Sequence, residues 1–358
     1  MELPSESDPA AAADAQGSLR TRLVSAGLSG LLLSLCFPNS SLVALLPVAL
    51  VPLMAAIQGA RVRAAALAGT VFALSFWILT IPWIAYTVHR YGGVPWWAAA
   101  IALVVTALIM VPPFGLMTAL VAALAPRSVL ALLFVWPAAW IAQEGFRTYI
   151  YVFGGFPWAL VAYPLAERPA WIQTASLGGV WLTSGLVILV NALFFCAVRS
   201  RVRRTRVALG LAALLLMGSV FSYGVWRMHA FKQLAAATPW VSVGVLQPNV
   251  SQDERWTAEA RRVIYDDLVA RTRTVARELK GTTRLILWPE SASPYQWSWS
   301  PELRDSVVAL CRELDVAIVL STAWSDTPES DEAPIYNAAV LVTSAGPVLP
   351  PYFKLRLV

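Results

Sequence analysis

The stretch that decides the fold is 285–295, which reads Leu-Ile-Leu-Trp-Pro-Glu-Ser-Ala-Ser-Pro-Tyr. Its apolar first half, Leu285 to Trp288, has the length and composition of a buried β-strand. A single carboxylate, Glu290, follows in a turn flanked by prolines, and α/β enzymes place catalytic groups on loops of this kind. The stretch therefore predicts an α/β domain in which Glu290 is the candidate functional residue.

The sequence on either side of this stretch continues the same pattern. Short apolar runs predict strands, and longer charged or amphipathic runs predict surface helices. Ser344 to Pro347 predicts a turn after the last of these strands. Because strands alternate with helices, we expect an α/β sandwich. The predicted strands are 241–246, 285–288, 316–321 and 338–343, and the predicted helices are 257–279 and 301–314.

The composition of the whole chain is that of a membrane protein, and its apolar excess lies before this region. Of the 358 residues, 58% are hydrophobic and 13% are charged, and the mean hydropathy is +0.62. These values predict a multi-pass membrane protein. The charges are sparse between Arg20 and Trp226 and recur at ordinary density from Thr238 onward. We therefore expect a disordered tail (1–19), a membrane domain (20–226) and a partial catalytic domain (238–358).

Seven apolar segments of the membrane domain predict transmembrane helices. The first two are short, and Pro38 to Ser41 separates them, so they form either a tight helical hairpin or one broken segment. With the tail inside, the basic residues that separate the segments all fall on the inner side, which satisfies the positive-inside rule. The segments are 23–37, 42–57, 64–86, 96–124, 129–142, 177–198 and 207–225, and the inner basic residues are Arg20, Arg22, Arg61, Arg63, Arg127 and the cluster from Arg199 to Arg206.

This topology places the chain after about Trp226 outside the membrane, which in a bacterial inner membrane is the periplasm. The net charge of +6 does not indicate nucleic-acid binding, because the arginines lie between apolar segments. The three cysteines, Cys36, Cys196 and Cys311, show no metal-binding or disulfide spacing. The aromatic loop 149–171, broken by glycine and proline, has two open readings, an interfacial aromatic belt or a lipid-binding segment.

Each candidate chemical group has a structural alternative. Glu290 is either a general base, whose pKa is raised because Trp288 and Tyr295 partly desolvate it, or a loop carboxylate that accepts backbone N–H bonds. Lys354 either stabilises a developing oxyanion or is a solvated lysine near a strand end. Cys311 lies on the apolar stripe of a predicted helix, so we expect a buried thiol and not a nucleophile.

A set of ordered motifs resembles the carbon–nitrogen hydrolase (nitrilase) superfamily. With the preceding membrane segments and Gly-Gly-Phe-Pro-Trp at 154–158, the resemblance is closest to the apolipoprotein N-acyltransferases of bacterial inner membranes. The motifs are Val-Gly-Val-Leu-Gln-Pro-Asn at 243–249, Trp256, Leu-Trp-Pro-Glu-Ser at 287–291, Tyr-Asn-Ala at 336–338 and Tyr-Phe-Lys-Leu-Arg-Leu-Val at 352–358.

The resemblance implies a Glu–Lys–Cys triad on an αββα nitrilase-like sandwich. Glu290 matches the general base, Lys354 matches the lysine that stabilises the oxyanion, and Trp256 matches a tryptophan near the substrate cleft. In the family's pattern the nucleophilic cysteine follows the lysine, so Cys311 does not match it. We therefore expect the sequence to be a C-terminally truncated member, without the nucleophile and inactive as it stands.

The resemblance also implies the reaction and its partners. The cysteine takes an acyl chain from a phospholipid as a thioester, and the N-terminal S-diacylglyceryl cysteine of an apolipoprotein then receives it, without a metal or organic cofactor. The expected location is the bacterial inner membrane, with the C-terminal domain in the periplasm. Two alternatives stay open: a membrane-tethered amidase or nitrilase, and a transporter or other non-catalytic membrane protein with a degenerate outer domain.

Overall fold

The structure is a computed structural model that describes residues 18–38, 40–124, 128–151, 155–250, 258–281, 284–330 and 332–355. The chain divides into two compact units, Met1–Ala236 and Ala237–Val358. Each unit has a separate hydrophobic core.

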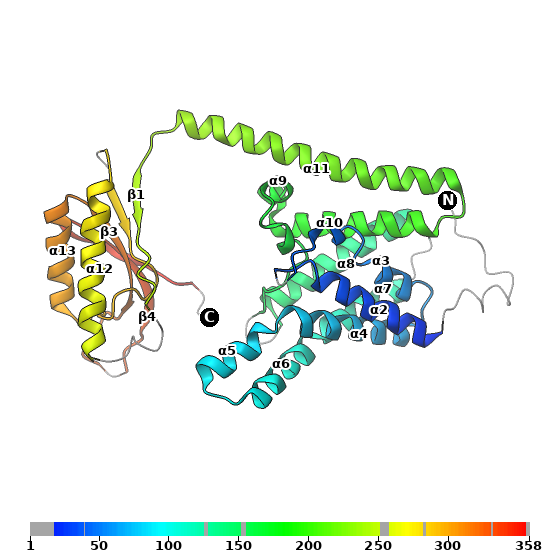
Figure 1. The fold of residues 1–358 in the computed structure, drawn as a ribbon, viewed down its shortest axis with the longest axis horizontal. Helices are drawn as coiled ribbons and strands as arrows, with labels where there is room; N and C mark the ends of the chain where they lie inside the picture. Colours follow the sequence, from blue (N-terminus) through cyan, green and yellow to red (C-terminus); the bar gives the residue numbers. More distant parts are fainter. Residues whose placement is uncertain are drawn as a thin grey trace. The chain divides into compact units, whose positions relative to one another are not determined.

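The described residues of the first unit form helices joined by short turns (Figure 1). Five helical stretches in the described part of the chain are long and apolar enough to cross a membrane: Val62–Thr80, Trp96–Leu124, Val129–Tyr149, Ala175–Arg199 and Arg203–Ala237. The helices are α2 (Leu19–Ser34), η1 (Val43–Leu45), α3 (Val51–Ile57), α4 (Val62–Thr80), α5 (Trp83–Gly92), α6 (Trp96–Met110), α7 (Pro112–Leu124), α8 (Val129–Tyr149), η2 (Tyr163–Leu165), α9 (Pro169–Ile172), α10 (Ala175–Arg199) and α11 (Arg203–Ala237).

The prediction of seven spanning helices stays a prediction, because these five candidates are identified by length and composition within the described residues. The first two predicted segments correspond to α2, which has 16 residues, and to η1 and α3, of which α3 has 7. The second segment does not form one helix because prolines interrupt it. Of the two readings left open for this region, the hairpin describes it: Ser29 Oγ of α2 donates to Ala49 O at 2.6 Å, and Arg22 Nη1 donates to Ala56 O at 2.5 Å.

The irregular stretch between η1 and α3 obtains its missing backbone partners from α10. Asn191 Nδ2 donates to Leu46 O at 2.9 Å, and Leu50 N donates to Asn191 Oδ1 at 2.9 Å. Asn191 is fully buried. A membrane protein must satisfy its backbone polar groups internally, so this asparagine stabilises the irregular stretch between η1 and α3.

The core of the first unit combines many aliphatic side chains with a cluster of aromatic rings from the long helices. Phe72 of α4 meets Trp140 of α8 with ring centroids 6.1 Å apart, and Trp77 meets Phe114 of α7 at 6.3 Å. Helix α2 packs closely on α4 at Gly30, where an added Cβ would lie 2.5 Å from Phe72 O. Small residues permit this approach, as is usual for helices packed in membranes.

The second unit is built on one five-stranded sheet of order β1-β2-β3-β4-β5. The first three strands are parallel, and β3, β4 and β5 are antiparallel neighbours. In chain order the elements are β1 (Ser242–Val245), α12 (Ala258–Glu278), β2 (Arg284–Leu287), α13 (Pro301–Leu314), β3 (Ala317–Trp324), β4 (Tyr336–Thr343) and β5 (Gly346–Phe353).

All four predicted strands and both predicted helices of this unit are present, with shifts of a few residues at their ends. Strand β5 was not among the predicted strands, because it contains Pro347, Pro350 and Pro351. It pairs only with β4 in the described sheet, and an edge strand tolerates residues that lack a backbone N–H.

Helices α12 and α13 lie side by side on one face of the sheet (Figure 1), joined by Arg273 and Glu313 at 2.8 Å. Alternate residues of the central strands point into this layer and are fully buried, among them Ile286, Ile318 and Val340. Cys311 is also fully buried there, with Sγ 3.5 Å from Val342 O, so the predicted core thiol is confirmed. Cys36 and Cys196 of the first unit are buried as well.

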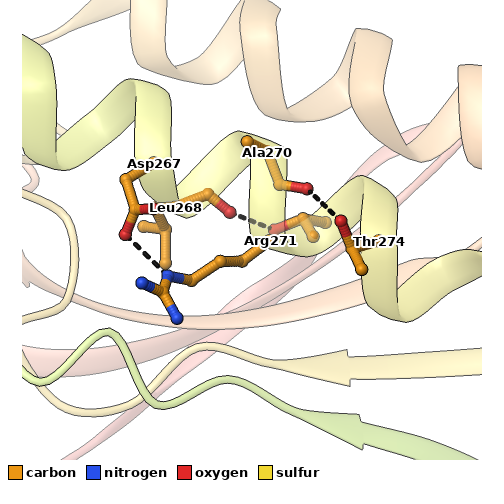
Figure 2. Close-up of polar contacts among 6 residues, drawn as sticks. Asp267, Leu268, Ala270, Arg271 and Thr274 are labelled. Carbon is orange, nitrogen blue, oxygen red and sulfur yellow. Dashed lines mark hydrogen bonds and ion pairs between the residues drawn. The ribbon is translucent and has the colours of Figure 1, made fainter.

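The outward side of α12 is an exposed and charged helix surface, as predicted. Figure 2 shows Arg271 Nε donating to the carboxylate of Asp267 at 2.6 Å, one turn away, and Thr274 Oγ1 donating to Ala270 O. Such i,i+4 pairs support a helix modestly. The inward side carries Thr272 Oγ1, which accepts from Trp288 Nε1 at 3.1 Å.

The opposite face of the sheet is apolar and open. Val243 and Val245 of β1 are 44% and 68% exposed, and Val348 and Tyr352 of β5 are 47% and 65% exposed. Within the described residues of this unit the sheet has one helical layer, so the predicted αββα sandwich remains a proposal.

Candidate functional site

Glu290 lies in a tight turn that follows the end of β2. Trp288 N donates to Val319 O at 2.9 Å, which extends the parallel pairing one residue past the strand. Ala292 N then donates to Pro289 O at 3.2 Å, and Ser291 adopts a left-handed conformation with φ of 54°. The turn therefore leaves Glu290 beside the carboxyl end of a parallel strand, where α/β proteins place functional groups.

The structure brings Glu290 and Lys354 together, although 64 residues separate them in the sequence. Lys354 Nζ donates to Glu290 Oε1 at 3.1 Å. Lys354 comes directly after β5, and its backbone N donates to Asn337 O of β4 at 2.8 Å, which fixes the base of the side chain. The two residues predicted as catalytic thus form an ion pair supported by three strands.

Asn337 completes the site, although the sequence analysis assigned it no role beyond a place in the Tyr-Asn-Ala motif. Its Nδ2 donates to Glu290 Oε1 at 2.8 Å, so the same carboxylate oxygen accepts from both the amide and the ammonium. Ser321 Oγ of β3 lies 3.5 Å from Asn337 Oδ1. The alternation of side chains along the predicted strand could have identified Asn337. Ala338 is buried, so its neighbour Asn337 points to the opposite, open face of the sheet.

The electrostatics of Glu290 differ from the expectation. The hydrogen bond from Lys354, then that from Asn337, and then the charge of Lys354 lower the pKa of this carboxyl below its ordinary value. The Glu290 side chain is 62% exposed and that of Lys354 is 34% exposed. The predicted upward shift through desolvation is therefore wrong for this structure, and the carboxylate is ionised at neutral pH.

The reason lies in where the two aromatic neighbours point. Trp288 is 4% exposed, and its indole packs under α12. It meets the Tyr265 ring of this helix in a T-shaped arrangement, with the two ring centroids 6.4 Å apart. Tyr295 also packs on Tyr265, at 5.5 Å. Both rings belong to the helical side of the sheet, so neither removes water from Glu290.

The pair can accept and stabilise charge, but the described residues bring no nucleophile to it. Burial raises the pKa of the Cys311 thiol to about 11, and this residue lies in the core between α13 and β4. Among the described residues no group of three histidine, cysteine or acidic side chains is placed to hold a metal ion. Trp256, Arg127 and Gly154 lie outside the described residues, and the assignment of Trp256 to the substrate cleft stays a prediction.

Comparison with known proteins agrees with the predicted resemblance. Residues 29–193 match the family described as apolipoprotein N-acyltransferase N-terminal domain. The chain is 29% identical over 341 residues to an apolipoprotein N-acyltransferase of Geobacter metallireducens, covering 92% of this chain and 62% of that protein. It is 31% identical over 267 residues to the one of Methylococcus capsulatus, covering 74% and 50%.

A third relative, the apolipoprotein N-acyltransferase of Chromobacterium violaceum, is 28% identical over 337 residues, which cover 94% of this chain and 61% of that protein. The chain therefore spans between half and about 62% of the length of these three relatives. The resemblance to a family of acyltransferase enzymes is confirmed over most of this chain.

Proposed function

We propose, from the confirmed resemblance to apolipoprotein N-acyltransferases, that this chain supplies the membrane domain and part of the catalytic domain of such an enzyme. The observation that carries the proposal is the Glu290–Lys354 pair with Asn337, held on one sheet face behind the Trp-Pro-Glu turn. A carboxylate beside an ammonium can accept a proton from a nucleophile and stabilise the charge that develops on an attacked carbonyl.

The proposed reaction has two steps. Glu290 takes the proton of a cysteine thiol, and the thiolate attacks the ester carbonyl of a phospholipid while Lys354 stabilises the oxyanion. The carbon–oxygen bond then breaks, the departing lysophospholipid takes the proton as its hydroxyl, and a thioester remains. In the second step the amino group of an S-diacylglyceryl cysteine attacks the thioester, forms an amide and releases the thiol.

The nucleophilic thiol of this proposal is not one of the buried cysteines of the chain. We assign it to the cysteine that, in the family's pattern, follows the lysine matched by Lys354. Both hydrogen bonds to Glu290 use Oε1, so the proposal assigns Oε2 to the thiol.

The open apolar face of the sheet supports a further layer over the site. We propose that a second sheet covers this face and completes an αββα sandwich, which would also desolvate the largely exposed Glu290. Loss of water around a carboxylate raises its pKa and makes it a stronger base, so the completed domain would offset part of the lowering caused by Lys354.

The location that we propose is the bacterial inner membrane, with the second unit in the periplasm. The five apolar helices support a membrane protein. Arg22 Nη1 donates to Gln58 O at 3.1 Å. Arg22 also interacts electrostatically with Arg199. The hydrogen bond goes to backbone three residues before Arg61, and both interactions support the proposal that these basic regions share one side of the membrane.

The test is N-acylation of a synthetic diacylglyceryl-cysteine peptide by the full-length gene product in phospholipid vesicles. Glu290→Gln should lower the rate by about 10²-fold or more, the usual contribution of a general base. Glu329→Gln, at an exposed loop position of the same unit, is the matched control and should keep the rate of the unmodified protein. Full activity of Glu290→Gln would exclude Glu290 as the base.

A further inference from the structure

Two buried charged residues of α8 hold the segment from Phe156 to Val161. Glu144 is 1% exposed and Arg147 is fully buried, although both lie in a helix apolar enough to cross a membrane. Val161 N donates to Glu144 Oε1 at 2.7 Å, and Arg147 Nη1 donates to the carbonyl oxygens of Phe156 and Trp158 at 2.8 and 2.5 Å. The two side chains thus bind the backbone at both ends of the segment.

The segment is also pressed against the end of α8. Phe156 N donates to Arg147 O at 2.7 Å. Gly155 has φ of 115°, and an added Cβ would lie 1.8 Å from Thr148 O, so only glycine fits there. These contacts fix the direction in which the chain leaves the helix and turns back along it.

Stability alone does not explain the use of two charges in this position. Charged side chains within membrane-spanning helices are costly, and replacing buried charges by well-packed apolar residues is often neutral or stabilising. Glu144 Oε2 and Arg147 Nε have no hydrogen-bond partner among the described residues, so the arrangement is not fully satisfied. The Arg147 guanidinium also lies over the Trp77 ring, 5.0 Å from its centroid.

The segment presents one large exposed side chain, that of Trp158. Phe156 turns inward and meets Trp77 with ring centroids 5.6 Å apart. Trp158 is 52% exposed and packs on Trp83, which is 44% exposed and opens α5, at 5.5 Å. A rigid backbone under an exposed pair of indoles indicates a contact surface, which we call the Trp83–Trp158 pair.

The place of this pair in the fold identifies its partner. Trp83 follows the end of α4 by three residues, and the segment follows the end of α8, so both indoles lie at the ends of apolar helices. The outward part of α5 continues with Tyr86, which is 52% exposed, and ends with His89 and Arg90 in its last turn. Indoles and tyrosines favour the level of the lipid headgroups, and a cation there complements a phosphate.

We propose that Glu144 and Arg147 are positioning residues that hold Trp158 against Trp83, and that this pair binds phospholipid at the boundary between headgroup and acyl chain. The occupant is a lipid of the bilayer, whose phosphate lies toward Arg90. The proposal concerns lipid contact by the first unit and does not depend on acyl transfer, so it stands or falls separately from the proposed enzyme activity.

The first test measures depth in the membrane. A nitroxide label at Trp158→Cys, in protein reconstituted in phosphatidylethanolamine and phosphatidylglycerol vesicles, should lie within the headgroup layer, on the order of 5–8 Å thick. Leu215→Cys, 71% exposed in α11 and about 18 Å along the helix from its start, is the control for a deep position. A label at position 158 that lies as deep as the one at 215, or that is reached only from bulk water, would overturn the lipid contact.

The second test measures the clamp through the mobility of the same label. Arg147→Gln should shorten the rotational correlation time of the label at position 158 several-fold, and Glu144→Gln should have a smaller effect. Arg168→Gln, an exposed arginine near the same segment, should leave the spectrum unchanged. Where Arg147→Gln does not give folded protein, Arg147→Lys keeps the charge but cannot bind two carbonyls in the same fork. An unchanged spectrum in the folded variant would show that the clamp does not position Trp158.

Discussion

The two units each contain a glutamate beside a basic residue, and the two arrangements serve different purposes. In the second unit Glu290 and Lys354 are 62% and 34% exposed and bond to one another. In the first unit Glu144 and Arg147 are buried, and their bonds go mainly to the backbone of a neighbouring segment. Exposure leaves the first pair free to meet a substrate, whereas burial commits the second pair to holding the chain in place.

Removal of the buried cation should cause a large loss of stability. Arg147→Ala leaves the Phe156 and Trp158 carbonyls and the nearby carboxylate without their partner, so we expect the free energy of unfolding to fall by about 3–5 kcal/mol. Thermal unfolding in detergent measures this change. Arg168→Ala serves as the exposed control and should shift the midpoint little. Equal midpoints for Arg147→Ala and the unmodified protein would remove the distinction between the pairs.

The exposed cation should show the opposite pattern. Lys354→Met removes the group proposed to stabilise the oxyanion, so the turnover of the full-length enzyme should fall by about 10²–10³-fold. Its unfolding midpoint should stay close to that of the unmodified protein, because exposed ion pairs contribute at most about 1 kcal/mol. Lys280→Met, another exposed lysine of the second unit, is the control for both measurements. A loss of stability without a loss of turnover would reverse the assignment.

Asn337 should have a smaller effect of the same kind. Asn337→Ala removes one of the two hydrogen bonds to Glu290 Oε1 and leaves Lys354 in place, so we expect turnover to fall about 10-fold, in line with about 1.5 kcal/mol for a bond to a charged group. The pKa of Glu290 should also rise, since the bond favours the ionised form. Steady-state kinetics measure the first change, and titration followed by carboxylate NMR of the second unit measures the other. Unchanged kinetics would mean that Asn337 has only a structural role.

The smallest expected effect is a dependence of stability on pH. Lys354 and Asn337 lower the pKa of Glu290 in the folded protein, so the ionised carboxylate stabilises the fold above its unfolded pKa. This contribution should disappear as the pH falls from the ordinary value of 4.5 through the lowered folded value. Unfolding midpoints across this range should therefore depend on pH less steeply in Lys354→Met than in the unmodified protein. Equal slopes would show that the bond contributes nothing in solution.

The sequence predicted local features well because local patterns determine them. The apolar run before Glu290 became β2, and the amphipathic spacing of 301–314 became α13 with Cys311 in the core. The pairing of Glu290 with Lys354 followed from the resemblance alone, since spacing does not reveal a contact across 64 residues.

What the sequence missed depends on tertiary context. The direction of the Trp288 and Tyr295 rings set the environment of Glu290 and so the sign of its pKa shift. The sheet edge permitted a strand with three prolines, and Asn191 of α10 stabilised a break that shortened the predicted spans. The role of Glu144 could not be predicted from the sequence, because its backbone partner Val161 belongs to a segment that follows the helix.

In the proposed mechanism Glu290 activates a thiol, which then carries the acyl chain. The most direct measurement is transfer of label from a phospholipid with a radioactive acyl chain to the full-length protein, without an acceptor peptide. We expect a protein-bound acyl group that hydroxylamine releases, formed by the unmodified protein and by Glu329→Gln but not by Glu290→Gln. Equal labelling of Glu290→Gln, or label that resists hydroxylamine, would contradict it.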